Sequence, residues 1–192
     1  SKNKELNLVY SIMIVEDEYL VRQGIASLVN YEQFGMQVIA QAENGIEAWQ
    51  KFQENPADIL LTDINMPQMN GLELAKLVRD QAPKCHIVFL TGYDDFDYAR
   101  TAIKLGADDY LLKPFSKGDV EEMLAKLQTK LDKERKKSQI QNLVDQGQRS
   151  ELEEAIHNRL ADSELSLKSL AFQLGFSPSY LSVLIKKELG LP

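Results

Sequence analysis

Four short apolar runs in this chain each end on a polar group that can carry chemistry. The groups that follow these runs are Glu16-Asp17-Glu18, Thr62-Asp63, Thr91 and Lys113-Pro114. A parallel strand that is buried on both faces reads as a near-continuous apolar run. The carboxyl ends of parallel strands meet at one edge of a sheet. The sequence therefore predicts that these groups gather in one pocket.

Helical patterns separate the runs. The predicted strands are 12–15, 38–40, 59–61, 87–90 and 110–112. Between them, apolar residues recur at helical spacing, Asn55-Pro56 stops one helix, Asn70-Gly71 opens the next and Gly106 closes a third. Crossovers of this length are right-handed. We therefore expect an α/β fold, a flavodoxin-like doubly wound five-stranded parallel sheet, followed by a small all-α segment.

Composition excludes several classes of protein. The chain has 192 residues, a net charge of −7 and one cysteine, Cys85. A disulfide framework is excluded, and a reducing, cytoplasmic location is expected. No apolar run reaches the roughly 18 residues of a membrane span. His86 and His157 lie far apart without neighbouring ligands, which argues against zinc.

The predicted pocket suits phosphoryl transfer to a carboxylate. Asp63 would be the nucleophile, with Mg2+ to neutralise charge on the phosphoryl oxygens. Lys113 would pair with a phosphoryl oxygen, and Thr91 would donate a hydrogen bond once phosphate is present. The predicted metal ligands are Glu16, Asp17, Asp63 and the backbone carbonyl of Asn65.

Each group also has an ordinary structural interpretation. The acidic run could be a solvated helix start, where the helix dipole favours acids. Asp63 could be a turn aspartate, and Thr91 and Lys113 could be routine strand-end residues. Their coincidence at four strand ends favours a shared pocket.

Residues 11–132 resemble the receiver domain of bacterial two-component response regulators. The motifs that carry the resemblance are Ile14-Val-Glu-Asp-Glu, Leu60-Leu-Thr-Asp-Ile-Asn-Met-Pro-Gln-Met-Asn-Gly, Phe89-Leu-Thr-Gly-Tyr and Gly106-Ala-Asp-Asp-Tyr-Leu-Leu-Lys-Pro. The resemblance implies that Asp63 accepts phosphate from the phosphohistidine of a histidine kinase. It also implies that Thr91 and Tyr110 form a switch pair and that the Lys113–Pro114 peptide bond is cis.

The segments around this domain are less informative. Residues 1–10 are expected to be a leader or an expression remnant. The helix from Gly118 carries Val120, Leu124, Leu127 and Leu131, which could pack on the sheet or form a short coiled-coil seam between two chains. Residues 133–150 are predicted to be a helical extension and linker, with a turn at Gln146-Gly-Gln.

Residues 151–192 resemble part of an AraC-type DNA-binding domain, the first of its two helix-turn-helix units. The matching motifs are Leu170-Ala, Leu174-Gly-Phe-Ser-Pro-Ser-Tyr-Leu-Ser and Lys186-Lys-Glu-Leu-Gly. On its second helix, Ser179, Ser182 and Val183 would meet base edges and Lys186 or Lys187 would meet phosphate. Because this segment holds 4 basic and 6 acidic residues, we expect DNA binding from the intact protein rather than from this truncated form.

The leading hypothesis is a phosphorylation-switched transcription regulator that forms homodimers on phosphorylation and does not turn over an external substrate. A phosphatase or transferase would want a general acid two residues after Asp63, where Asn65 stands. A flavin carrier would need a phosphate loop after the first strand, which Glu16-Asp17-Glu18 would repel. An interaction module without DNA binding or without phosphorylation is the remaining alternative.

Overall fold

The computed structural model describes residues 9–92, 96–104, 106–159 and residue 175. The chain divides into two units, residues 1–130 and 131–192. Residues 1–8 of the leader predicted at 1–10 lie outside the described residues, as do the predicted DNA contacts Ser179, Ser182, Val183 and Lys186, so the DNA-binding segment stays a prediction.

The first unit is built on a five-stranded parallel sheet in the order β2-β1-β3-β4-β5. The strands are β1 (Tyr10–Val15), β2 (Met36–Ala42), β3 (Ile59–Asp63), β4 (His86–Thr91) and β5 (Asp109–Leu112). The predicted fold class is thus confirmed. Strand β1 begins at Tyr10, one residue before the predicted start of the receiver domain.

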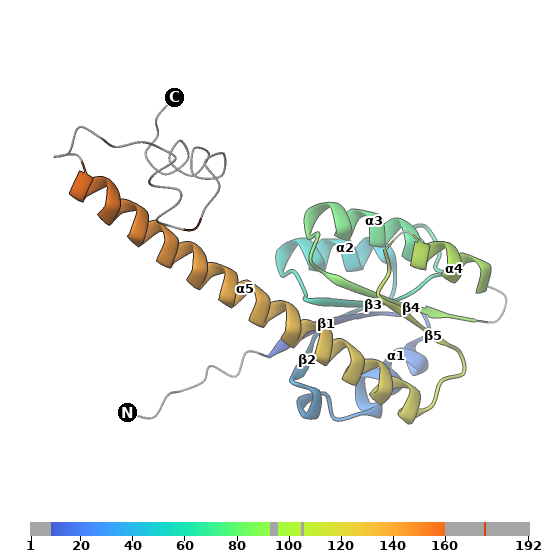
Figure 1. The fold of residues 1–192 in the computed structure, drawn as a ribbon. Helices are drawn as coiled ribbons and strands as arrows, with labels where there is room; N and C mark the ends of the chain where they lie inside the picture. The colour runs from blue at the N-terminus through green and yellow to red at the C-terminus, as the bar shows by residue number, and fades with distance from the viewer. Residues whose placement is uncertain (1–8, 93–95, 105, 160–174, 176–192) are drawn as a thin grey trace. The chain divides into compact units, whose positions relative to one another are not determined.

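Helices cover both faces of this sheet (Figure 1). They are α1 (Tyr19–Leu28), the 3-10 helix η1 (Tyr31–Phe34), α2 (Gly45–Glu54), α3 (Gly71–Gln81), α4 (Phe96–Lys104) and α5 (Lys117–Arg159). Helices α2, α3 and α4 lie on one face, and α1 and the first turns of α5 lie on the other (Figure 1). This is the doubly wound arrangement that right-handed crossovers produce.

Polar residues cap the starts of several helices, including the start predicted at Asn70-Gly71. The side chains of Asn44 and Asn70 accept hydrogen bonds from backbone N–H groups three residues on, at the starts of α2 and α3. Before α5, Ser116 Oγ accepts from the Asp119 N–H and Asp119 Oδ2 accepts from the Ser116 N–H. Such reciprocal caps satisfy the N–H groups that a helix start leaves unpaired.

Alternate residues of the strands fill two apolar layers. The layer under α2, α3 and α4 includes the strand residues Met13, Val15, Leu60 and Phe89 together with Phe52 of α2, all buried. Ile12, Ile14 and Leu61 alternate with these residues and are fully buried on the opposite face. The polar groups follow directly on these buried strands. Packing of the strands therefore fixes the edge of the sheet from which the polar groups project.

The start of α5 belongs to the core of its own domain. Val120, Leu124 and Leu127 are at most 3% exposed within the single chain. Their apolar spacing is therefore explained by packing on the sheet, and they are not available to a coiled-coil seam between two chains. Burial of an apolar side chain of this size is worth about 1.5–3 kcal/mol.

The turn predicted at Gln146-Gly-Gln is wrong, because α5 continues without a break to Arg159. A single glycine in a helix costs only about 1 kcal/mol relative to alanine, and the residues around Gly147 are good helix formers. The prediction gave one glycine too much weight.

Within the described part of the chain, no helix is both long and apolar enough to cross a membrane.

At the edge opposite the functional groups, Asp108 joins several elements. Lys130 Nζ of α5 lies 2.6 Å from Asp108 Oδ1, His86 Nδ1 of β4 lies 2.9 Å from the same oxygen, and the Ile87 N–H donates to Oδ2 at 2.7 Å. Burial alone would raise the pKa of Asp108, but hydrogen bonds from His86 and Lys130 outweigh it and hold this pKa well below its ordinary value.

We predict that Asp108→Asn lowers the free energy of unfolding by about 1–3 kcal/mol, because buried donors lose a charged acceptor. A carboxylate with a lowered pKa in the folded state stabilises it above the unfolded pKa of about 3.9. This contribution is lost as pH falls through the folded-state pKa. Urea unfolding should therefore show a difference from the parent in free energy of unfolding that narrows as the pH falls below about 4. The exposed Asp80→Asn is the control, and an equal loss in both variants would contradict the role of Asp108.

Candidate functional site

Three carboxylates meet at the carboxyl edge of the sheet. Glu16 and Asp17 follow β1 directly, and Asp63 is the last residue of β3. The register that pairs Val15 with Thr62 brings these strand ends side by side. One carboxylate oxygen from each residue lies within 4.8 Å of the other two. The predicted acidic cluster is therefore present in the geometry.

Lys113 reaches this cluster from the end of β5. The pairing of Thr91 with Leu112 and a 2.7 Å hydrogen bond from the Lys113 N–H to the Thr91 carbonyl fix the local backbone. The Lys113 ammonium nitrogen lies 2.8 Å from Glu16 Oε2 and 3.4 Å from Asp63 Oδ2. The predicted lysine thus touches two of the three carboxylates.

Burial perturbs the charges of this cluster. The Glu16 side chain is fully buried, and burial, together with the nearby Asp63 charge, raises the pKa of Glu16 to about 7 against the opposing effect of Lys113. Burial also raises the pKa of Asp63, with a further contribution from the Asp17 charge. For Lys113, burial alone would lower the pKa, but the contacts with Glu16 and Asp63 outweigh it and raise it.

The backbone at the site is held by residues that the sequence did not single out for this role. The Arg22 guanidinium of α1, which is 9% exposed, donates to the Glu16 carbonyl at 2.7 Å. The Thr62 hydroxyl donates to the Asp63 carbonyl at 3.0 Å. Gly71, the first residue of α3, packs so closely that a Cβ there would clash with the Asp63 carbonyl oxygen. The Asn70-Gly71 pair signalled the helix start, but nothing in the sequence signalled the close approach.

The donor set fits a hard divalent cation. All the ligand atoms are carboxylate oxygens, which Mg2+ and similar ions prefer. Glu16 Oε2 is buried with the Lys113 ammonium beside it but, among the described residues, without an aligned hydrogen-bond donor. Asp17 is exposed and open to solvent. When all three carboxylates are ionised, one ammonium leaves two negative charges for a cation to balance.

The other predicted residues lie in the expected elements. Thr91 is fully buried, and its hydroxyl donates to the Gly92 carbonyl at 3.2 Å. Tyr110 is partly buried against the apolar layer under α2, α3 and α4. Asn65 is exposed two residues beyond Asp63, and its carbonyl as a ligand stays a prediction. The Lys113–Pro114 peptide bond is cis, as the resemblance implied.

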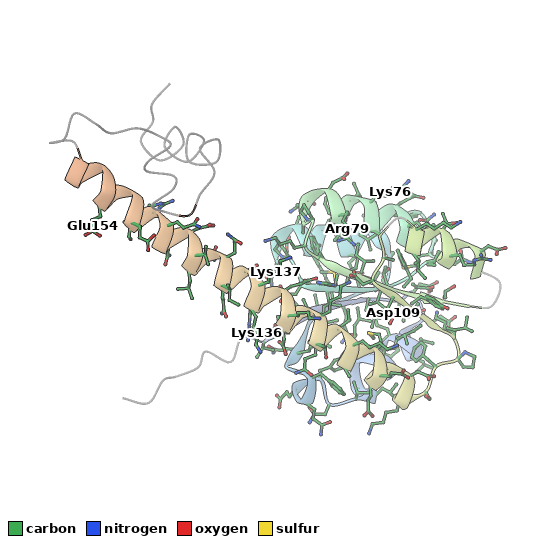
Figure 2. The ribbon with its side chains drawn as sticks, viewed as in Figure 1. Lys76, Arg79, Asp109, Lys136, Lys137 and Glu154 are labelled. Carbon is green, nitrogen blue, oxygen red and sulfur yellow. The ribbon has the colours of Figure 1, made fainter. Side chains whose placement is uncertain are left out.

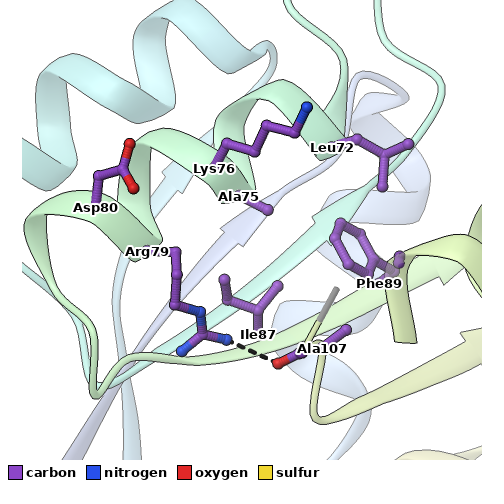
Figure 3. Close-up of a pocket in the computed structure, with 10 residues that line it drawn as sticks. Leu72, Ala75, Lys76, Arg79, Asp80, Ile87, Phe89 and Ala107 are labelled. Carbon is purple, nitrogen blue, oxygen red and sulfur yellow. Dashed lines mark hydrogen bonds between the residues drawn. The ribbon is translucent and has the colours of Figure 1, made fainter. Parts of the chain in front are cut away.

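A separate cavity of about 250 Å³ lies beside α3 and above β4 (Figure 3). Its wall is mainly apolar, with Leu72, Ile87 and Phe89, and Lys76 stands at its rim. Arg79 crosses it and donates to the Gly106 carbonyl at 3.0 Å. None of the predicted site residues is among those described as lining it, so this cavity is distinct from the acidic cluster.

Comparison with known proteins agrees with this geometry. Residues 12–125, more than half of the chain, match the model of the response regulator receiver domain family. The class that the sheet and its acidic edge define is the receiver domain, and the chain belongs to that family. The family match ends at residue 125.

Relatives include transcriptional regulators. The chain is 37% identical over 123 residues to an uncharacterized transcriptional regulatory protein, YesN, of Bacillus subtilis, covering 62% of this chain and 33% of that protein. It is 30% identical over 119 residues to the transcriptional regulatory protein HptR of Staphylococcus aureus, covering 62% and 46%. The match thus spans less than half of each relative's length.

Solved structures match the receiver part. The REC domain of AraT, a response regulator from Geobacillus stearothermophilus, is 42% identical with a TM-score of 0.64, covering 66% of this chain and 98% of that one. A two component transcriptional regulator AraC from Clostridium phytofermentans ISDg is 36% identical with a TM-score of 0.60, covering 64% and 96%.

Two glycine substitutions test how closely the backbone packs at the site. We predict that Gly71→Ala destabilises the protein by about 2 kcal/mol or more, because its Cβ would meet the backbone of Asp63 and Ile64. Gly24→Ala, inside α1 with open space around it, should instead stabilise by about 0.5–1 kcal/mol. Urea unfolding measures both. Equal effects of the two substitutions would refute the close approach.

Proposed function

We propose that this chain is the input part of a response regulator, in which Asp63 accepts a phosphoryl group from the phosphohistidine of a sensor histidine kinase. The observation that carries the proposal is the position of the Lys113 ammonium, 2.8 Å from Glu16 and 3.4 Å from Asp63, beside three clustered carboxylates. Such a cluster is suited to receiving a phosphoryl group and balancing its charge.

In the proposed reaction, an Asp63 carboxylate oxygen attacks phosphorus in line. The new O–P bond forms as the P–N bond to the kinase histidine breaks, and the imidazole nitrogen leaves with the bonding electrons. Lys113 already stands beside the Asp63 oxygens, so it can pair with a phosphoryl oxygen without a large movement. Glu16 holds the other side of the ammonium and so orients Lys113.

Mg2+ is the proposed cofactor, with Glu16, Asp17, Asp63 and the carbonyl of Asn65 as its proposed protein ligands. When bound, it supplies positive charge to the phosphoryl oxygens in the transition state. Asp17 offers a solvent-facing carboxylate, while Glu16 is buried behind it. This division suits an ion that keeps several waters.

Thr91 and Tyr110 form the proposed switch. In the structure the Thr91 hydroxyl donates to the adjacent Gly92 carbonyl, a weak local bond that a phosphoryl oxygen could replace. Movement of Thr91 opens space behind it, which the half-buried ring of Tyr110 can enter. The surface of α4, β5 and α5 then changes, and we propose that this favours homodimers.

The proposed output is DNA binding by residues 151–192 with the remainder of the intact protein, and hence control of transcription. The similarity to YesN and HptR, both named as transcriptional regulatory proteins, supports it. We further propose that the protein acts in the cytoplasm and turns over only its own aspartyl phosphate. The same proposal assigns residues 11–132 to the receiver domain, 133–150 to a helical extension and linker, and 151–192 to part of the DNA-binding domain.

Incubation with a small phosphodonor, acetyl phosphate or phosphoramidate, tests the acceptor. We predict Mg2+-dependent labelling by mass spectrometry that is abolished in Asp63→Ala and Asp63→Asn, and by EDTA in the parent. Asp80→Asn is the matched control and should label at the parent rate, because Asp80 is exposed at the end of α3. Labelling that persists in Asp63→Ala would show that Asp63 is not the phosphoryl acceptor.

A second variant separates acceptance from switching. We predict that Thr91→Ala still becomes labelled, because Asp63 and Lys113 remain in place, but loses the conformational response. Amide hydrogen exchange, followed with and without phosphodonor, should change in β4 and β5 of the parent and stay unchanged in Thr91→Ala. A full response in the variant would remove Thr91 from the switch.

A further inference from the structure

The second part of α5 carries an apolar stripe that is exposed to solvent. Ile140, Leu143 and Val144 are 61%, 68% and 43% exposed. Leu143 and Val144 lie one helical turn after Ile140, and Gly147 follows one turn later with open space where a Cβ would point. A helix that shows such a stripe to water normally has a partner there.

The charges that flank this stripe have opposite signs at its two ends. Lys133 and Lys136 precede it, and Glu151 and Glu154 follow it. At about 100° per residue, the apolar and charged positions fall within one sector about 100° wide, so they share a single helix face. All four charged residues are exposed, and Lys136 and Glu154 project from the helix (Figure 2). Within the described part of the chain, no ion pair of these four residues is found.

The pattern is self-complementary about the midpoint between Leu143 and Val144. Ile140 and Gly147 lie equally far from this point, as do Lys136 and Glu151, and Lys133 and Glu154. If two copies of the helix lie antiparallel about a two-fold axis through it, each lysine meets a glutamate of the other copy. Ile140 then meets the space beside Gly147. A two-fold interface requires this kind of reciprocal match.

A parallel pair in register would be disfavoured by the same charges. Each lysine would face the same lysine of the other copy, and each glutamate the same glutamate, and like charges at such a seam destabilise it. Charge thus selects the antiparallel arrangement.

We propose that residues 133–154 of α5 form an antiparallel two-helix interface with a second copy of this chain. The stripe of Ile140, Leu143 and Val144 is its centre, and the Lys136–Glu151 and Lys133–Glu154 contacts form its ends. The interface does not use Asp63, so it is independent of the proposed phosphorylation and is present in the unphosphorylated chain.

Engineered cysteines in the full 192-residue chain test the orientation. Ile140→Cys and Gly147→Cys proteins, carrying tags of different mass, are mixed in a glutathione redox buffer. The proposal expects the mixed disulfide to exceed both self-disulfides. In an antiparallel pair the two Cys residues of Ile140→Cys lie about 10 Å apart along the axis, beyond disulfide reach. The native Cys85 is buried and its pKa is raised to about 12 by burial, so the parent should not cross-link.

Charge reversal tests the contacts through sedimentation equilibrium at low salt. Lys136→Glu should raise the dissociation constant about tenfold or more, since each substitution acts at two symmetric places. Adding Glu151→Lys should restore it. Gln146→Glu, on another face of α5, is the control and should leave the constant within about twofold. Circular dichroism checks that every variant remains helical. Asp63→Ala should dimerise like the parent, which separates this interface from the phosphorylation proposal.

Three results would overturn the interface. A dominant Ile140→Cys self-disulfide would show a parallel pair. A parent chain that stays monomeric at high micromolar concentration would leave the stripe to another segment of its own chain or to a different partner. Failure of Glu151→Lys to rescue Lys136→Glu would show that these two residues do not meet.

Discussion

The site depends on one ammonium group held between two buried carboxylates. Removing a carboxylate from water costs several kcal/mol unless opposite charge and hydrogen bonds compensate it. Lys113 compensates Glu16 and Asp63 only in part, because the pKa of Glu16 still rises to about 7 and that of Asp63 also rises. The cluster is therefore under-neutralised as it stands. Where the carboxyl groups are ionised, residual negative charge of this kind favours a cation and disfavours free phosphate.

The fold supplies the precision that this balance needs. The backbone that carries the acidic side chains is held in place: Arg22 donates to the Glu16 carbonyl, Thr62 donates to the Asp63 carbonyl and Gly71 packs on the same peptide. The buried strands β1 and β3 set the separation of the acids, and β5 sets the reach of Lys113. The points from which the carboxylates project are thus fixed by the fold. A site on mobile loops alone would lack this fixed geometry.

The sequence predicted the parts of the site that a strand end determines. Glu16, Asp17, Asp63, Thr91 and Lys113 follow apolar runs, and parallel pairing brings such ends together whatever the details of the crossovers. Arg22 and Gly71 could not be found in the same way, because their contacts depend on the path of a helix start over the sheet edge. The spacing of Val120, Leu124 and Leu127 left two partners open, and only their burial in the chain decided between them. At Gly147 the sequence predicted a turn, but the helix propensity of the neighbouring residues outweighs the single glycine and α5 continues.

The same two strands link the acidic edge to the attachment of α5. Thr91 ends β4 and His86 begins it, while Lys113 follows β5 and Asp108 precedes it. At the far edge His86 and Lys130 share the Asp108 carboxylate, and Lys130 belongs to α5. Strand β4 has six residues and β5 has four, and both are closely packed. A shift of one strand against the other would therefore change the geometry around Asp108 as well as that around Lys113. In the proposed function, a charge change at Asp63 would reach Asp108 and its partner Lys130 through these short strands, because packed elements transmit movement as rearranged contacts.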